Sequence, residues 1–152
     1  MPEHAPQNPA VEAELVTRLI AAINAQDAQG AAAFYAEGFI FEDIALGLCV
    51  RDHRVYSTTL DAWLAAVPDT WSEARTLVAC PGSAAATWVV TGTLATVFPG
   101  LPEGFVVGSK IKVRGASVFT FGPDMKITRH EDYYSLDAQV LQTDSGTTGG
   151  GA

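Results

Sequence analysis

The first part of the chain carries apolar residues at helical spacing. From Pro9 onward they recur every three or four residues, and the run ends in a polar stretch, residues 24–27. This period predicts an amphipathic helix from Pro9 to about residues 24–27, because one face of such a helix would gather Val11, Leu15, Val16, Leu19, Ile20 and Ile23.

Two shorter helices and a strand are expected to follow. Residues 28–35 have a helical composition that is broken around Gly38, and residues 60–67 form a run that Pro68 stops. Between them, residues 39–43 read Phe-Ile-Phe-Glu-Asp, and aromatic and β-branched residues are typical of a strand. The N-terminal half is therefore predicted to be mainly helical.

The second half of the chain is strand-like. Runs over 75–79, 84–97, 110–121 and 127–135 are separated by the turn signals Cys-Pro-Gly, Phe-Pro-Gly and Gly-Pro-Asp. Helices followed by an antiparallel meander predict an α+β domain, whose helices cover one face of a strongly curved, mostly antiparallel sheet. Such a bent sheet leaves room for a conical cavity, so the fold itself is expected to provide a ligand site.

Composition and charge exclude several classes of partner. The chain has 152 residues, 48% hydrophobic and 17% charged, which suits a single domain with a real core. Its 17 acidic and 9 basic side chains give a net charge of -8 without any Lys/Arg run, so nucleic acid and membranes are poor partners. No secretion signal or bilayer-spanning run occurs, and two cysteines without a ligand spacing are typical of a cytoplasmic protein.

One domain is expected over 10–142, between two segments that lack apolar periodicity. Residues 1–9 hold three prolines, and residues 143–152 are rich in Gly, Thr and Ser. Both segments are predicted to be flexible, the first as an N-terminal arm and the second as a C-terminal tail.

The run Lys-Ile-Thr-Arg-His-Glu-Asp-Tyr-Tyr over 126–134 carries the most informative polar residues. Residues two apart in a strand share a face, so Thr128, His130, Asp132 and Tyr134 are expected to point the same way. Inside a cavity, His130 and Asp132 would flank a small substrate and exchange protons with two of its atoms.

Asp43 and Ser117 are further candidates for the cavity. Asp43 ends the strand over 39–43, where the parity that buries Phe39 and Phe41 also turns the carboxylate inward. A desolvated carboxylate is a suitable base for a proton alpha to a carbonyl. Ser117 lies on the strand over 110–121 and would donate one hydrogen bond to a substrate oxygen.

Each of these candidates also has a structural interpretation. His130 would then be a partly exposed strand residue, and Asp132 an ion-pair partner of Arg114 or Arg129. Asp43 would form the turn that follows it, since Asp is common in turns. A serine on an apolar strand face is often satisfied by the backbone. The sequence leaves both interpretations open.

Aromatic residues are candidates for the cavity wall, although most would serve equally well as core. They would suit a hydrophobic ligand such as a polycyclic or terpenoid compound. No His, Asp or Glu spacing resembles a metal site, and GxGxxG, Walker and GxSxG motifs do not occur, so no metal or other cofactor is expected. The aromatic candidates are Tyr35, Tyr56, Trp63, Trp71, Trp88 and Phe119.

The chain also resembles a known family in three segments, LVTRLIAAINAQDAQGAAAFYAEGFIFEDIALG, WVVTGTL and KVRGASVFTFGPDMKITRHEDYY. They resemble the SnoaL-like branch of the nuclear transport factor two superfamily, which includes ketosteroid isomerase and limonene epoxide hydrolase. The resemblance covers nearly all of 11–142 and implies the fold predicted above, as a conical barrel. It also implies a homodimer that packs outer sheet faces, to which Val106, Val107 and residues 118–121 would contribute.

The resemblance assigns roles to two carboxylates. Asp43 in FEDI matches the catalytic base of ketosteroid isomerase. Asp132 in HEDYY matches the general acid of the epoxide hydrolases, and it lies near the acid/base Asp of the polyketide cyclases. The resemblance therefore implies that both carboxylates belong to one cavity.

Four positions depart from the relatives. Leu19 and Ser117 stand where ketosteroid isomerase has its oxyanion-hole Tyr and its protonated Asp. Val89 and Thr91 stand where the epoxide hydrolases have Arg and Asp. These departures argue against steroid isomerase chemistry in its usual form and leave the epoxide hydrolase triad with a single acid.

The sequence thus predicts a cofactor-independent isomerase or cyclase that acts on a polyketide-like or related natural product. Its catalytic residues would be Asp132, His130 and Asp43. An epoxide hydrolase or epoxide-opening cyclase is one alternative, and a non-catalytic ligand-binding or dimerisation module is another. The predicted substrate-binding residues are Tyr35, Phe41, Trp63, Trp88, Thr91, Ser117, Phe119 and Tyr134.

Overall fold

The computed structural model describes residues 10–136, so the predicted arm over 1–9 and the tail over 143–152 lie outside the described residues. Among residues 10–136, no helix is long and apolar enough to cross a membrane. In chain order the elements are α1 (Ala10–Asn24), α2 (Ala28–Ala32), β1 (Tyr35–Asp43), β2 (Leu48–Val50), α3 (His53–Ala66), β3 (Trp71–Cys80), β4 (Ser83–Thr93), β5 (Lys110–Phe121) and β6 (Ile127–Tyr134).

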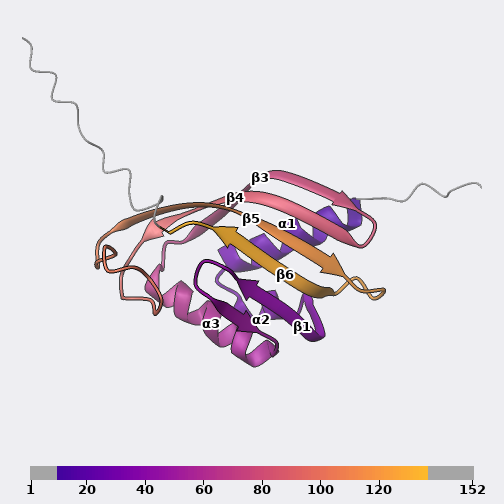
Figure 1. The fold of residues 1–152 in the computed structure, drawn as a ribbon, viewed down its shortest axis with the longest axis horizontal. Coiled ribbons are helices and arrows are strands. Elements are labelled where there is room, and N and C mark those ends of the chain that lie inside the picture. Colours follow the sequence, from indigo (N-terminus) through magenta and orange to yellow (C-terminus); the bar gives the residue numbers. More distant parts are fainter. Residues whose placement is uncertain (1–9, 137–152) are drawn as a thin grey trace, which may run out of the picture.

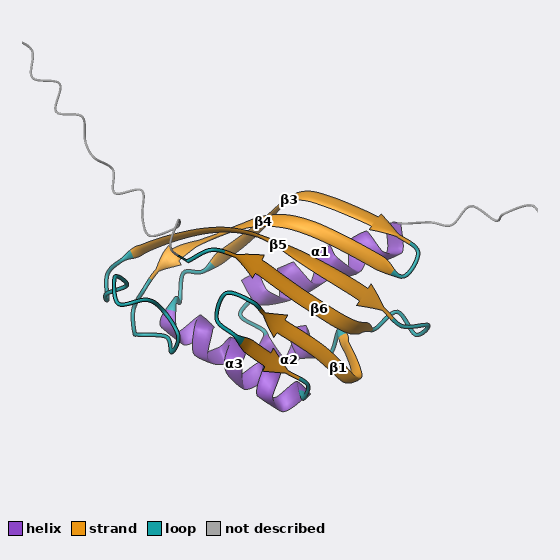
Figure 2. Ribbon diagram, viewed as in Figure 1, coloured by secondary structure: helices purple, strands orange, loops and turns teal. Residues whose placement is uncertain are grey.

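The described strands form a six-stranded sheet in the order β2-β1-β6-β5-β4-β3. All neighbouring strands are antiparallel except β1 and β6, which run parallel. Figure 1 shows the helices behind the sheet, with α1 crossing behind the central strands and α3 near β1, and Figure 2 separates the two layers by colour. The predicted α+β class and mostly antiparallel sheet are confirmed, while the strong curvature of the sheet stays a prediction.

Capping residues set the starts of the two later helices. Asp27 and Asp52 each accept a hydrogen bond from the backbone N–H three residues on, at 2.8 and 3.0 Å. Helix α3 begins at His53, well before the predicted residue 60. The sequence did not indicate this start, because the first turns of the helix are largely polar and show no apolar period. The predicted helix up to residue 35 is wrong, since α2 ends at Ala32 and Tyr35 begins β1 as a partner of β6.

The strands follow the predicted runs with shifted ends. Strand β5 has the predicted bounds, and β6 ends one residue early. Strand β4 ends at Thr93 rather than 97, because Leu94 and Ser109 close a separate loop over 94–109 by a 2.9 Å backbone hydrogen bond. Strand β3 begins already at Trp71, and the three-residue strand β2 was not predicted.

The inner face of the sheet carries the core. Along β5 the residues at odd positions, such as Ile111 and Phe119, are buried, whereas the even positions Lys112 and Val118 are exposed. This alternation is the one that the sequence predicts for a half-buried strand. Buried apolar side chains form one cluster around α1, α2 and β5 and a second around the loop over 94–109.

Candidate active site

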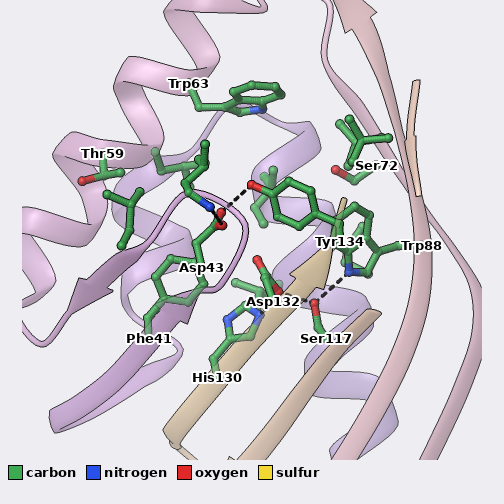
Figure 3. Close-up of a pocket in the computed structure, with 18 of the residues that line it drawn as sticks. Phe41, Asp43, Thr59, Trp63, Ser72, Trp88, Ser117, His130, Asp132 and Tyr134 are labelled. Atoms are coloured by element: carbon green, nitrogen blue, oxygen red, sulfur yellow. Dashed lines mark hydrogen bonds and ion pairs between the residues drawn. The ribbon is translucent and has the colours of Figure 1, made fainter. Parts of the chain in front are cut away.

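A cavity of about 210 Å³ lies between the helices and the inner face of the sheet. Its largely apolar wall comes from α1, α3, β4 and β5, and from Phe98, Leu101 and Phe105 of the loop over 94–109. Polar groups gather in one part of it, where Figure 3 shows Asp43, Ser117, His130, Asp132 and Tyr134.

Strand β6 supplies three of these polar residues. His130, Asp132 and Tyr134 alternate along the strand and all line the cavity, as the period of two predicts. Thr128 does not share this face, so that part of the prediction is wrong. The pairing of β5 with β6 shifts by one residue next to Thr120, and this irregularity turns Thr128 to the exposed side.

Asp132 is held by two hydrogen bonds on the same oxygen. The Ser117 hydroxyl donates to Oδ1 at 2.5 Å, and Nε2 of His130 lies 2.7 Å from Oδ1. The indole N–H of Trp88 in turn donates to the Ser117 oxygen at 2.8 Å. These contacts, drawn in Figure 3, orient the carboxylate in the cavity.

Two of the structural alternatives for the same strand do not hold, and the ion pair of Asp132 with Arg114 stays a prediction. His130 is only 6% exposed, so it is not a partly exposed strand residue. Arg129 forms ion pairs with Glu42, at 3.1 Å, and with Glu131 rather than with Asp132. The proposed Arg129–Asp132 pair is therefore wrong.

Asp43 lies at the end of β1, directly beside Asp132 of β6 in the parallel register. Its Oδ2 accepts a 2.7 Å hydrogen bond from the Tyr134 hydroxyl, and its Oδ1 accepts one of 2.9 Å from the backbone N–H of Leu46. Asp43 thus both forms the following turn and faces the cavity. Burial raises the pKa of its carboxyl, and the nearby charge of Asp132 acts in the same direction.

Tyr35 is buried and does not line the cavity, unlike the other predicted aromatic residues Phe41, Trp63 and Trp88. Its hydroxyl oxygen lies 2.7 Å from Nδ1 of His130 and 3.1 Å from the Tyr56 hydroxyl oxygen. Burial raises the pKa of Tyr35 well above the usual value, so this side chain stays a phenol.

Most of the predicted wall residues line the cavity. The exceptions on β3 and β4 are Trp71, which is 57% exposed, and Thr91, which is exposed on the outer side of β4. On β4, Trp88 and Val90 face the cavity, whereas Val89 is buried without lining it. The predicted wall residues that do line the cavity are Phe41, Tyr56, Trp63, Trp88, Ser117, Phe119 and Tyr134.

Three contributions were missed by the sequence analysis. The loop over 94–109 had no strand or helix period and was treated partly as strand and partly as turn. The hydrogen bond between Tyr35 and His130 joins residues that are far apart in the sequence. The backbone N–H of Leu46 was not named as the donor to Asp43, although the turn that Asp43 forms was one of the open interpretations. Only the apolar residues of the loop, such as Phe98 and Phe105, gave a local hint of burial.

The charges of the cavity favour some ligands over others. Its described lining contains the carboxylates of Asp43 and Asp132 and no Lys or Arg side chain. Within residues 10–136, no group of three or more His, Cys, Asp or Glu side chains could hold a metal ion. The geometry offers two acidic groups, an imidazole and hydroxyl donors for proton transfer in an apolar space.

Comparison with known proteins identifies relatives of the sequence and the fold. The sequence profile of the SnoaL-like domain matches residues 16–130. Among curated proteins, none is a significant match to the sequence. Many solved structures are similar to this fold.

Three of these structures illustrate the range. A protein provisionally described as a polyketide cyclase, from Xanthomonas campestris pv. campestris, has 26% identity and a TM-score of 0.70, covering 88% of this chain and 98% of that one. SalBIII, an epoxide hydrolase/cyclase-like enzyme in pyran ring formation in the polyether salinomycin, has 16% identity and a TM-score of 0.73, covering 89% and 98%. A hypothetical protein with a ketosteroid isomerase-like fold from Catenulispora acidiphila, in complex with trimethylamine, has 19% identity and a TM-score of 0.68, covering 84% and 92%.

Proposed function

Because the chain belongs to the SnoaL-like domain family, we propose that it is a cofactor-independent enzyme that isomerises or cyclises a polyketide-like or related small molecule by acid/base proton transfer. The observation that carries this proposal is the environment of Asp132. Its carboxylate opens into an apolar cavity and is oriented there by Ser117 and His130. A positioned acid or base contributes a rate factor of about 10² to 10⁴.

Asp132 performs the central proton transfer in this proposal. Both of its described hydrogen bonds go to Oδ1, so Oδ2 is the oxygen that meets the substrate. Oδ2 takes a proton from a carbon alpha to a carbonyl, and the C–H electron pair forms the enolate. Reprotonation at another carbon gives an isomer. Alternatively, the enolate carbon attacks a second carbonyl and closes a ring, and Asp132 returns its proton to the new alkoxide.

Asp43 assists from the neighbouring strand. The raised pKa of its carboxyl increases the fraction that is protonated near neutral pH, compared with a free aspartic acid. A protonated Asp43 donates a hydrogen bond to the enolate oxygen and so stabilises the negative charge that develops there. The hydroxyl of Tyr134 holds the side chain of Asp43 in place.

The cavity fits an uncharged and largely apolar substrate. Its volume of about 210 Å³ exceeds the about 150 Å³ of an engineered cavity that binds benzene. A bicyclic ketone such as 2-tetralone therefore has a suitable size for a probe. The oxygen atoms of such a substrate would lie at the polar part of the cavity, near Asp43 and Asp132.

Deuterium exchange tests the proposal. We expect the wild-type protein to accelerate exchange of the alpha protons of 2-tetralone in D₂O, followed by ¹H NMR. Asp132→Asn should lower the catalysed rate by a factor of about 10² to 10⁴, whereas Arg129→Ala, on the other side of β6, should retain it. An unchanged rate in the Asp132→Asn variant would remove Asp132 from the mechanism. Binding of 2-tetralone without any exchange would instead favour a ligand-binding module.

Epoxide opening is the second candidate, because two carboxylates lie side by side in the cavity. Here Asp132 protonates the epoxide oxygen while Asp43 orients a water molecule or an internal hydroxyl group for attack on the ring carbon. A panel of bicyclic epoxides in ¹⁸O-labelled water distinguishes the two activities. Epoxide opening incorporates the label into a diol or closes an ether. An isomerase instead leaves the epoxides intact and exchanges the alpha protons of 2-tetralone in D₂O.

A further inference from the structure

The imidazole of His130 is fixed between two aromatic rings. Its centroid lies 4.3 Å from that of Phe119, in a stacked arrangement, and 4.8 Å from that of Phe41. Each ring nitrogen has one hydrogen-bonding neighbour: Nδ1 has the Tyr35 hydroxyl and Nε2 has Oδ1 of Asp132, both at 2.7 Å. The imidazole therefore connects the buried phenol to the carboxylate in the cavity.

On the Asp132 side, the direction of each hydrogen bond follows from the donors. An indole N–H can only donate, so Trp88 donates to Ser117, and the Ser117 hydroxyl proton is directed to Asp132. When Asp132 is a carboxylate, it can only accept. Nε2 of His130 must then carry a proton and donate it to Oδ1.

On the other side, Tyr35 has one proton and two neighbouring acceptors. Its oxygen lies 2.7 Å from Nδ1 of His130 and 3.1 Å from the Tyr56 oxygen, so the contact with the imidazole is the stronger one by length. If Tyr35 donates to Nδ1, His130 is neutral and Nδ1 is an acceptor. If it donates to Tyr56 instead, Nδ1 must carry a proton as well, and the buried imidazole would be a cation.

We propose that Tyr35 is a positioning residue, whose hydroxyl donates to Nδ1 and holds His130 as the neutral Nε2–H tautomer that hydrogen-bonds Asp132. This inference rests on the proposed function, because it takes Asp132 as the carboxylate that accepts the substrate proton. Tyr35 does not line the cavity, so it acts on the substrate only through His130 and Asp132.

This arrangement has a clear chemical use. A neutral imidazole orients the carboxylate by a hydrogen bond without forming a full ion pair with it. Both bonds to Asp132 go to Oδ1, so Oδ2 keeps its lone pairs for the substrate. Without the Tyr35 donor, Nδ1 would be a buried acceptor with no partner, and the alternative Nδ1–H tautomer would turn a lone pair of Nε2 toward Asp132.

Nitrogen NMR of the full chain tests the tautomer directly. The chain has three histidines, and His130→Gln identifies the signals of residue 130 in protein labelled with ¹⁵N-histidine. In the wild type we expect a protonated Nε2 and a hydrogen-bonded, unprotonated Nδ1. In Tyr35→Phe, Asp132 still requires the proton on Nε2, so we expect the Nε2 signal to stay and the Nδ1 signal to move away from that of a hydrogen-bonded acceptor. Tyr56→Phe is the matched control, because it removes the neighbouring buried hydroxyl but should leave the tautomer unchanged.

Kinetics add a second measurement, using 2-tetralone exchange. Tyr35→Phe should lower kcat by about tenfold, the effect of one lost hydrogen bond, and should leave KM unchanged because Tyr35 does not contact the substrate. A wild-type His130 that is protonated on Nδ1 overturns the inference, and so does a Tyr35→Phe variant whose Nδ1 signal is the same as in the wild type. If Tyr35→Phe does not fold, the wild-type nitrogen spectrum still tests the inference, because it shows whether Nδ1 of His130 carries a proton.

Failure of this inference can be distinguished from failure of the proposed function. If the Asp132→Asn variant retains full exchange activity while the Nδ1 signal of His130 depends on Tyr35, the proposed function is wrong and the assignment of Tyr35 as the donor to His130 holds. If Asp132→Asn loses activity while the Nδ1 signal does not depend on Tyr35, the proposed function holds and the inference is wrong.

Discussion

Asp43 and Asp132 are register partners on the parallel strands β1 and β6, and both carboxylates line the same cavity. Partner residues on adjacent strands, which lie about 4.8 Å apart, point to the same face of the sheet. The backbone N–H of Ile44 donates to the carbonyl of Asp132 at 3.0 Å and extends this pairing past the end of β1. The parallel pairing thus joins two acidic groups that are far apart in the sequence.

The buried Asp43 should make the stability of the protein depend on pH. Burial, assisted by the charge of Asp132, raises the pKa of folded Asp43 above its unfolded value of 3.8. The folded state then binds the proton more tightly, so the stabilising contribution of Asp43 is complete below the unfolded pKa and is lost as the pH rises through the folded pKa.

Asp43→Asn removes this titration. Relative to the wild type, we expect the free energy of unfolding of Asp43→Asn to increase as the pH rises from about 3.5 to about 7, because only the wild type loses the contribution of a protonated Asp43. Urea unfolding at a series of pH values measures this difference. A difference between the two proteins that does not vary with pH would show that Asp43 titrates alike in the folded and unfolded chains.

The two carboxylates should also select ligands by charge. 2-Naphthol and 2-naphthoate share a ring system of suitable size, but the second carries a negative charge near neutral pH. A ligand carboxylate about 6 Å from a cavity carboxylate is repelled by about 3 kcal/mol at an effective dielectric constant of about 20. We therefore expect 2-naphthoate to bind up to about a hundredfold more weakly, as measured by calorimetry.

The control for this selection is the double variant Asp43→Asn/Asp132→Asn. Removing both acidic groups should bring the affinities for the two naphthalene ligands much closer together. If the wild-type protein binds the naphthol and the naphthoate equally well, the ligands do not enter the polar part of the cavity.

Gly115 makes room for the Trp88 ring. A Cβ atom at Gly115 would lie 2.5 Å from two atoms of this ring and 2.8 Å from the carbonyl oxygen of Tyr133. Gly115→Ala should therefore displace the indole from Ser117 and destabilise the protein by about 1 to 3 kcal/mol. Denaturant unfolding measures the loss, and Lys112→Ala at an exposed position of the same strand should change stability by less than about 0.5 kcal/mol.

Strand periodicity made much of the candidate site predictable. The alternation along β5 placed Ser117 and Phe119 inside, and the alternation along β6 did the same for His130 and Asp132. The inward orientation of Asp43 was predicted in the same way, because Asp43 shares the parity of Phe39 and Phe41. Period-two patterning is a strong signal where one face of a strand is buried and the other is exposed. The proton-transfer roles of these residues stay predictions.

The remaining features depend on contacts between distant segments. The irregular pairing next to Thr120 reverses the side of Thr128, and no residue type in the sequence marks it. The sequence around Tyr35 favours the end of a helix, but Tyr35 pairs with β6 and begins a strand. Tertiary contacts override a weak local preference. Thr91 faces outward because Trp88 and Val90 are inward positions of β4, and residues an odd number apart on a strand point to opposite faces.

The outer face of the sheet should form a homodimer, which we propose from its exposed apolar side chains. Val118 and Tyr133 on β5 and β6 are 43% and 46% exposed, whereas Phe119 points inward. A lysine at the centre of a packed apolar interface would be buried without a partner. Val118→Lys should therefore yield monomers in analytical ultracentrifugation, while Val55→Lys, at an exposed position on helix α3, should remain dimeric like the wild type. A monomeric wild type at micromolar concentration would contradict the proposed dimer.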